Sequence, residues 1–144
     1  IKVQKKPFLG YLFDNLLKAG YKDIVLVTGY KAHLFEDFLR EYGYRANVLN
    51  QYDILGKDQY GTACPVRCAK DIIGQEHFLY VCGDNLYSVK DLAEMNVSGR
   101  YNYVAGFLHN NPEKYGVLIT DDGFLEEIIE KPKEYVGNLI NTGL

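Results

Sequence analysis

Two short segments of this sequence carry charged side chains in places suited to phosphate and metal chemistry. Gly83-Asp84 directly follows an apolar run, so the Asp84 carboxylate would stand at a rigid strand end, where it could ligate Mg²⁺. Asp84 could equally cap the turn that follows, as aspartate often does. Glu130-Lys131 joins a hydrogen-bond acceptor to a cation, which suits a hydroxylated phosphate ester, although such pairs more often lie on a solvated face.

A second group of segments is rich in glycine and small polar residues. Gly61-Thr62-Ala63 opens a predicted helix; glycine lets a ligand approach the backbone, and the N–H groups of a helix start favour an anion or a base edge. An ordinary helix start explains the same three residues. Tyr115-Gly116 and Asn141-Thr142-Gly143 complete the set of candidate binding segments.

The spacing of apolar residues predicts the helices and strands that carry these candidate residues. Helical spacing predicts helices, and short apolar runs rich in β-branched residues predict strands. The predicted helices are 8–17, 34–42, 62–73 and 89–95, and the predicted strands are 24–27, 46–49, 78–82 and 102–107. A polar loop is expected from Asn50 to Tyr60, and a β-hairpin is expected from 117–119, the turn 121–123 and 124–129.

This alternation predicts an α/β fold in which a mostly parallel sheet is flanked by helices and carries a small antiparallel hairpin. No linker or repeat interrupts it, so residues 1–144 are expected to form a single domain. In open α/β sheets the ligand sits outside the carboxyl ends of the strands. Residues 28–30, 50–62 and 83–85 fall at such ends.

Composition excludes several classes of protein. The 144 residues include 16 Lys+Arg and 19 Asp+Glu, a balance that argues against nucleic-acid binding, and no apolar run is long enough to span a bilayer. The three cysteines, Cys64, Cys68 and Cys82, show no disulfide framework, which favours a reducing, cytoplasmic location. Cys64 and Cys68 have the spacing of metal ligands, but small buried thiols are the better interpretation.

Taken together, the motifs resemble the sugar-1-phosphate nucleotidyltransferase family, the NDP-sugar pyrophosphorylases. Each motif is short, and the order in which they occur carries the resemblance over essentially the whole chain. The matching segments are Lys6-Pro7 leading a helix to Gly20, 24–32, 61–63, 83–85, 112–117, 129–132 and 141–143.

The resemblance implies a Rossmann-like nucleotidyltransferase domain. It also implies a reaction in which an NTP and a sugar 1-phosphate give an NDP-sugar and pyrophosphate. UTP or dTTP is the favoured NTP, guanosine and cytidine nucleotides stay open, and glucose 1-phosphate is the default sugar. Positioning and charge neutralisation by Mg²⁺ and cationic side chains would do most of the catalytic work. The implied partners are the NTP and the sugar 1-phosphate, and neither nucleic acid nor a membrane is expected. The oligomeric state stays open, and a homo-oligomer is one possibility.

The resemblance also implies a role for individual residues. Asp84 would be the catalytic metal ligand that holds Mg²⁺ between the nucleotide and sugar phosphates. The nucleotide would contact Gln51, Gly61, Thr62 and Gly83. The sugar phosphate would contact Gly116, Glu130, Lys131 and Asn141.

The sequence also departs from the family pattern. Relative to the family, we expect this chain to be an internal portion, without the N-terminal glycine-rich loop and the C-terminal part, and therefore to have little pyrophosphorylase activity by itself. The family usually has a Gln about five residues before Gly-Thr-Ala, whereas Gln51 lies ten before Gly61, so Gln59 competes with Gln51 for the base.

Two other functions compete with the nucleotidyltransferase. The first is a non-catalytic nucleotide- or sugar-phosphate-binding module, which the missing phosphate loop would suit. The second is a metal-dependent glycosyltransferase with an Asp-x-Asp motif, which is weaker because the third position of such a motif starting at Asp84 is Leu86, after Asn85.

Overall fold

The computed structural model describes residues 1–97 and 99–144. These residues form two compact units. Unit 1 contains Ile1–Phe78 and Leu86–Asn96, and unit 2 contains Leu79–Asn85 and the described part of Val97–Leu144. Within the described residues, no helix is long and apolar enough to cross a membrane.

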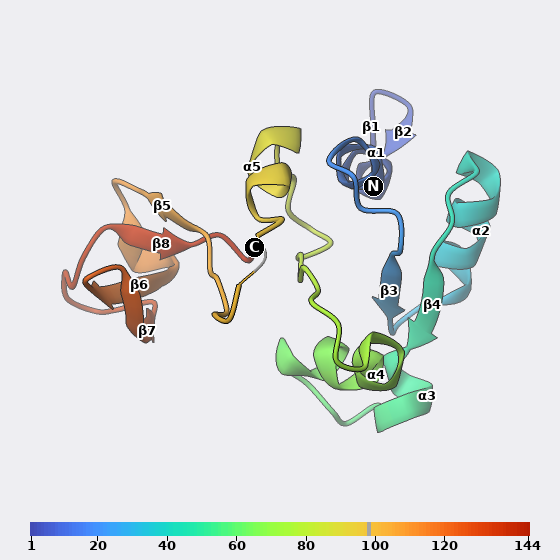
Figure 1. Cartoon of the computed structure of the whole chain (residues 1–144). Helices are drawn as coiled ribbons and strands as arrows, with labels where there is room; N and C mark the ends of the chain where they lie inside the picture. The colour runs from blue at the N-terminus through green and yellow to red at the C-terminus, as the bar shows by residue number, and fades with distance from the viewer. Residues whose placement is uncertain (98) are drawn as a thin grey trace. The chain divides into compact units, whose positions relative to one another are not determined.

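Unit 1 contains a parallel pair of strands joined by a helix. Strand β3 (Val25–Thr28) pairs in register with β4 (Asn47–Asn50), and α2 (His33–Tyr42) connects them (Figure 1). Helix α2 ends at Gly43, whose φ of 71° is a left-handed conformation that favours glycine. This βαβ arrangement confirms the strands and the helix predicted between residues 24 and 49.

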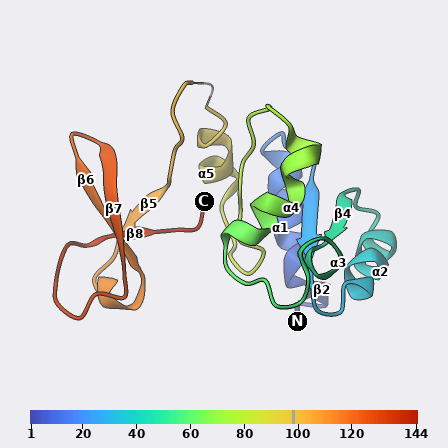
Figure 2. The same cartoon turned by 90° about the horizontal axis from the view of Figure 1, so that it is seen from below.

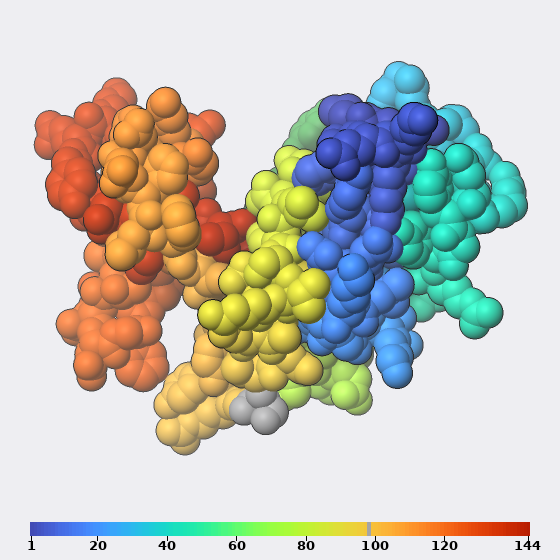
Figure 3. Space-filling model, turned by 90° about the horizontal axis from the view of Figure 1, so that it is seen from above, coloured from blue at the N-terminus to red at the C-terminus, as the bar shows by residue number. Residues whose placement is uncertain are grey.

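Helix α1 (Phe8–Lys18) forms the core of unit 1 together with α2. It follows a short hairpin of β1 (Lys2–Val3) and β2 (Lys6–Pro7). The Phe13 ring lies 5.7 Å from Phe38 of α2 and 5.0 Å from Tyr44, measured between ring centroids. Helix α5 (Val89–Glu94) contacts α1, and Figure 3 shows α1 in blue with α5 in yellow beside it.

Two further helices follow β4 in unit 1 (Figure 2). The first, α3 (Gln51–Leu55), occupies part of the region expected to be a loop, because the Asn50 side chain accepts a hydrogen bond from the Tyr52 backbone N–H at 3.1 Å and caps a helix. The second, α4 (Ala63–Ile73), confirms the predicted helix. Cys64, Cys68 and Ala69 form its buried face, as expected for structural thiols.

The predicted strand at 78–82 is wrong. None of its residues is in a helix or strand, and Phe78 is exposed. A strand requires backbone hydrogen bonds to a neighbouring strand, and residues 78–82 take part in no such ladder among the described residues. An apolar run indicates burial but does not supply the partner strand.

Unit 2 contains a four-stranded antiparallel sheet in the order β5-β8-β6-β7. Its strands are β5 (Gly106–Leu108), β6 (Gly116–Asp121), β7 (Phe124–Glu130) and β8 (Leu139–Asn141), with a 3-10 helix η1 (Pro112–Lys114) before β6. The β6–β7 hairpin is confirmed, and its turn has positive φ at Asp122 (45°) and Gly123 (80°), as a tight hairpin requires.

Of the strand expected at 102–107, only the last two residues are in a strand. Strand β5 starts at Gly106, where pairing with Asn141 of the three-residue strand β8 begins. The whole chain combines helices around a parallel pair with a small antiparallel sheet, so the predicted α/β class is confirmed. The antiparallel part has four strands where a hairpin was expected.

Candidate functional site

One face of the antiparallel sheet in unit 2 collects three of the predicted sugar-binding residues. Gly116 pairs with Glu130 across β6 and β7, and Asn141 pairs with Gly106 across β8 and β5. Paired residues in a sheet share a face, and so do residues two apart along a strand. A Cβ on Gly106 would lie 3.1 Å from the side chain of Leu118, so Gly106 and Leu118 share a face. Leu118 is two residues from Gly116 on β6, so Gly116 shares this face as well. Gly116, Glu130 and Asn141 therefore lie on the same face.

Gly116 makes room for the Glu130 carboxylate. A Cβ on Gly116 would lie 2.8 Å from Glu130 Oε1 and 3.1 Å from Ile128 Cγ2, both closer than ordinary contact. Gly116 is buried, whereas Glu130 is exposed at the end of β7. The absence of a side chain at position 116 thus sets where the acceptor oxygens of Glu130 can lie.

Lys131 follows Glu130 in a left-handed backbone conformation, with φ of 45°. Few residues other than glycine adopt this conformation, and it costs of order 1 kcal/mol or more. The Lys131 backbone N–H donates to the Tyr115 oxygen at 3.0 Å, which continues the β6–β7 pairing beyond Glu130. The turn away from the strand therefore begins at the predicted phosphate-binding lysine.

Asn141, at the end of β8, holds the loop that follows it. Its Oδ1 accepts a hydrogen bond from the Gly143 backbone N–H at 2.9 Å. This contact distinguishes the Oδ1 atom of the amide from the Nδ2 group, so Nδ2 is the group that can donate to a ligand oxygen. Donation to a sugar hydroxyl suits the role expected for Asn141.

The turn at Gly83-Asp84-Asn85 also belongs to unit 2. The turn is exposed, and the Asn85 backbone N–H donates to the Cys82 oxygen at 3.2 Å to close it. The Asn85 side chain donates from Nδ2 to the Thr142 backbone oxygen at 3.1 Å. The structure thus brings the turn that carries Asp84 next to the loop that follows Asn141, a link that the sequence order alone does not reveal.

Asp84 is the carboxylate that the sequence predicts as a metal ligand. Among the described residues, no three His, Cys, Asp or Glu side chains cluster as a ready-made metal cage. Mg²⁺ commonly uses one or two protein carboxylates and completes its shell with water and substrate phosphates. The single exposed carboxylate of Asp84 can serve in this way.

The predicted nucleotide-binding residues Gln51, Gly61 and Thr62 lie in unit 1: Gln51 begins α3, whereas Gly61 and Thr62 directly precede α4. Gly61 is exposed with φ of 107°, and Thr62 is the residue before the first turn of the helix. The Gly61 backbone oxygen accepts from the Cys64 backbone N–H at 3.1 Å. Gly61 and Thr62 therefore present backbone at a helix N-terminus, as expected from the sequence.

Gln51 and Gln59 contact each other across the loop that was expected to contain the base-reading glutamine. Gln51 donates from Nε2 to the Gln59 backbone oxygen at 2.9 Å, while Gln59 Oε1 accepts from Arg67 of α4 at 3.4 Å. Sequence reasoning missed Arg67, and also Tyr52, whose ring lies 3.3 Å from where a Cβ on Gly29 would be. Which glutamine meets a base stays a prediction.

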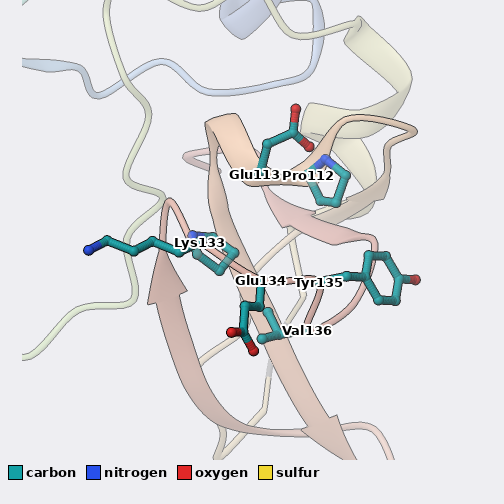
Figure 4. Close-up of a pocket in the computed structure, with 7 residues that line it drawn as sticks. Pro112, Glu113, Lys133, Glu134, Tyr135 and Val136 are labelled. Atoms are coloured by element: carbon teal, nitrogen blue, oxygen red, sulfur yellow. The ribbon is translucent and has the colours of Figure 1, made fainter.

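A hollow in unit 2 is lined by residues that directly follow Lys131, the predicted phosphate-binding lysine. It is lined by η1 and the segment after Lys131: Pro112, Glu113, Pro132, Lys133, Glu134, Tyr135 and Val136. Figure 4 shows the Lys133 and Tyr135 side chains extending in opposite directions. None of the predicted site residues lines this hollow.

The sequence model of the nucleotidyl transferase family matches residues 1–144. The chain belongs to this family. Among curated relatives, it is 32% identical to mannose-1-phosphate guanyltransferase 2 of Candida glabrata, over 96% of this chain and 40% of that protein. It is 28% identical to mannose-1-phosphate guanyltransferase of Saccharomyces cerevisiae, over 100% of this chain and 42% of that protein. The chain thus spans about two fifths of the length of these nucleotidyltransferases.

Two solved structures share the fold of this nucleotidyltransferase chain. One, described as a glucose-1-phosphate thymidylyltransferase from Bacillus anthracis in complex with sucrose, has a TM-score of 0.74 and 22% identity, covering 99% of this chain and 59% of that one. The other, apo UDP-glucose pyrophosphorylase, has a TM-score of 0.70 and 19% identity, covering 99% and 65%. These similarities confirm the Rossmann-like nucleotidyltransferase fold expected from the motifs.

Proposed function

We propose that the full-length protein transfers a nucleotidyl group from an NTP to a sugar 1-phosphate and releases pyrophosphate. Family membership over the whole chain supports the reaction class. The observation that carries the proposal is the gathering, within unit 2, of the face with Gly116, Glu130 and Asn141 and the turn with Asp84, linked through Asn85 and Thr142. An acceptor, an amide donor and a metal-binding carboxylate are the groups that a sugar phosphate requires.

The chemistry is an in-line displacement at phosphorus. A phosphate oxygen of the sugar 1-phosphate attacks the α-phosphorus of the NTP, the bond from that phosphorus to the bridging oxygen breaks, and pyrophosphate leaves with the electron pair. The protein therefore needs to position the two substrates and neutralise their charge. A bound Mg²⁺ would supply charge neutralisation at the phosphates, with Asp84 as its protein ligand.

Each predicted residue has a separate task in this proposal. Glu130 accepts hydrogen bonds from sugar hydroxyls, Asn141 donates to them from Nδ2, and the Lys131 ammonium pairs with the sugar phosphate. In unit 1, Gly61 and Thr62 lie along the base, together with Gln51 or Gln59. Gly83 lies beside the nucleoside. Residues 1–144 together form part of one nucleotidyltransferase domain.

The base and the sugar are proposed from the relatives. The sequence alone favoured UTP or dTTP, whereas the curated relatives at 28–32% identity are named as mannose-1-phosphate guanyltransferases. The structures named for thymidylyl and UDP-glucose chemistry are only 19–22% identical. We therefore place GTP with mannose 1-phosphate first and UTP or dTTP with glucose 1-phosphate second.

The three free cysteines support a cytoplasmic location.

The test is an assay of the full-length protein with four NTPs against several sugar 1-phosphates, following pyrophosphate release with and without Mg²⁺. We expect one pair to be used at least tenfold better than the rest, and activity to require the metal. Binding of both substrates without pyrophosphate release in any combination would instead identify a non-catalytic binding module.

Two substitutions assign the roles within the active protein. Asp84→Asn removes charge that the transition state requires, so it should lower kcat far more than it weakens sugar binding. Glu130→Gln should instead raise KM for the sugar 1-phosphate. A loss confined to sugar KM in Asp84→Asn, or unchanged sugar kinetics in Glu130→Gln, would contradict the assignment.

A further inference from the structure

The turn at Cys82–Asn85 and the end of β8 are separated by more than 50 residues, and the Asn85 side chain links them. Its Nδ2 group donates to the Thr142 backbone oxygen at 3.1 Å. The turn carries Asp84, and Thr142 is the residue directly after Asn141. One hydrogen bond therefore spans from the neighbour of the predicted metal ligand to the neighbour of the predicted sugar-binding amide.

Both ends of this link are held in place. Thr142 donates to the Ala105 backbone oxygen from its backbone N–H (3.2 Å) and its hydroxyl (2.9 Å), and Ala105 donates to the Leu144 oxygen at 3.0 Å. At the other end, the Asn85 backbone N–H closes the turn on Cys82. Since each segment is ordered by its own bonds, the Asn85 side chain acts between two defined structures.

Asp84 itself lies on an exposed turn, so the direction of its carboxylate depends on where that turn is held. Phosphoryl transfer is sensitive to the relative placement of the groups that hold the two substrates, and a displacement of about 1 Å can cost 100-fold in rate. A contact that fixes the Asp84 turn against the Asn141 loop therefore has a consequence for the reaction as well as for the fold.

We propose that Asn85 is a positioning residue that sets the Asp84 turn relative to the sugar-binding end of β8. This inference rests on the proposed function, because it requires Asp84 and Asn141 to act on the two substrates of one reaction. Asn85 acts through its neighbours, because its Nδ2 group donates to Thr142.

The test compares three variants of the full-length protein. Asn85→Leu keeps the approximate size of the side chain and removes the donor, Asn85→Gln retains an amide that can reach the same oxygen, and Asn110→Leu changes an exposed asparagine elsewhere in unit 2. We expect Asn85→Leu to lower kcat/KM for the sugar 1-phosphate about 3- to 10-fold, the range for one lost hydrogen bond. Asn85→Gln should recover at least half of this loss, and Asn110→Leu should match the wild type.

A second measurement, hydrogen exchange without substrate or metal, reports on the link itself. Loss of the Asn85 donor should speed exchange of the Asn85, Thr142 and Gly143 backbone amides together, although they lie in distant parts of the sequence. A local role in the turn would speed exchange at Asn85 alone. Faster exchange confined to the turn, or kcat/KM within twofold of the wild type at equal folded fraction, would overturn the proposal.

The outcome of the wild-type assay separates this inference from the function on which it rests. Failure of the wild-type protein to form an NDP-sugar from any substrate pair overturns the proposed function. An active wild type with an unchanged Asn85→Leu variant overturns only the positioning role of Asn85.

Discussion

Asn141 shows how a single contact can determine what a side chain offers to a ligand. Because Oδ1 accepts from the Gly143 backbone N–H at 2.9 Å, the Nδ2 donor is the end directed to other partners. Asn141→Asp keeps an acceptor for Gly143 and replaces the donor with a second acceptor. We expect the variant to fold normally and to raise KM for the sugar 1-phosphate at least tenfold, because a carboxylate would repel the phosphate and could not donate.

Steady-state kinetics and thermal unfolding of the same Asn141→Asp preparation check this prediction. The melting temperature should stay within a few degrees of the wild type. An unchanged sugar KM would show that the donor end of Asn141 does not meet the sugar.

Gly116 is expected to act through Glu130. A methyl group at position 116 would meet Glu130 Oε1 at 2.8 Å, so Gly116→Ala must displace the carboxylate. The carboxylate can move because it is the flexible end of an exposed side chain, whereas Ile128 Cγ2, 3.1 Å from the added methyl group, must also shift, so Gly116→Ala should lower stability somewhat as well as raise sugar KM. The double variant Gly116→Ala/Glu130→Gln should be little worse than Glu130→Gln alone. Additive losses in the double variant would mean that Gly116 contacts the sugar independently.

At the scale of elements, an ion pair joins the start of the chain to α1. Lys6 of β2 donates to Asp14 of α1, and the Tyr44 hydroxyl donates to the other carboxylate oxygen of Asp14 at 2.6 Å. The hydrogen bond from Lys6, followed by that from Tyr44, lowers the pKa of Asp14, and the same contact with Asp14 raises the pKa of Lys6. The cluster therefore ties β2, α1 and the segment after α2 together.

These pKa shifts predict how the stability of unit 1 depends on pH. Because the pKa of Asp14 is lower in the folded protein, its stabilisation is complete at neutral pH and is lost as the pH falls below about 4. Asp14→Asn should lower the free energy of unfolding by about 1 kcal/mol at pH 7, a modest value because both partners are partly exposed. The difference should shrink at about pH 2.5.

Urea unfolding at the two pH values measures this effect. Asp37→Asn provides the matched control, since Asp37 pairs with Arg40 on the exposed surface of α2 and should change stability little at either pH. An Asp14→Asn difference that is constant with pH would show that the carboxylate charge is not involved.

The helices and strands also show which patterns in the sequence were sufficient to predict an element. Helices α1 and α2 combine helical apolar spacing with a proline at the start or a glycine at the end, so local signals agree with the packing. Helix α3 was missed because its five residues carry little apolar pattern and depend on the Asn50 cap. Residues 78–82 were misassigned because the apolar run does not specify a neighbouring strand.

For the whole molecule, the two sets of predicted binding residues fall mainly in different units. Gln51, Gly61 and Thr62 belong to unit 1, while the sugar-binding set belongs to unit 2 together with Gly83 and Asp84. Thr62→Val should therefore raise KM for the NTP several-fold and leave the sugar KM within twofold, the opposite pattern to Asn141→Asp. Initial-rate kinetics with each substrate varied in turn decide this. A Thr62→Val effect mainly on the sugar KM would contradict the partition.

The α/β class, the βαβ segment, the hairpin and the family could be predicted from the sequence alone, because each depends on local spacing or on the order of motifs along the chain. The sequence also named Asp84, Glu130 and Asn141 as residues suited to phosphate and sugar chemistry. Only folding brings together groups from distant segments: Asn141 of β8 on the face of Gly116 in β6, and Asn85 against Thr142. Such contacts join residues far apart in the sequence, so no periodicity or local propensity encodes them, and they arise only when the sheet and its loops pack.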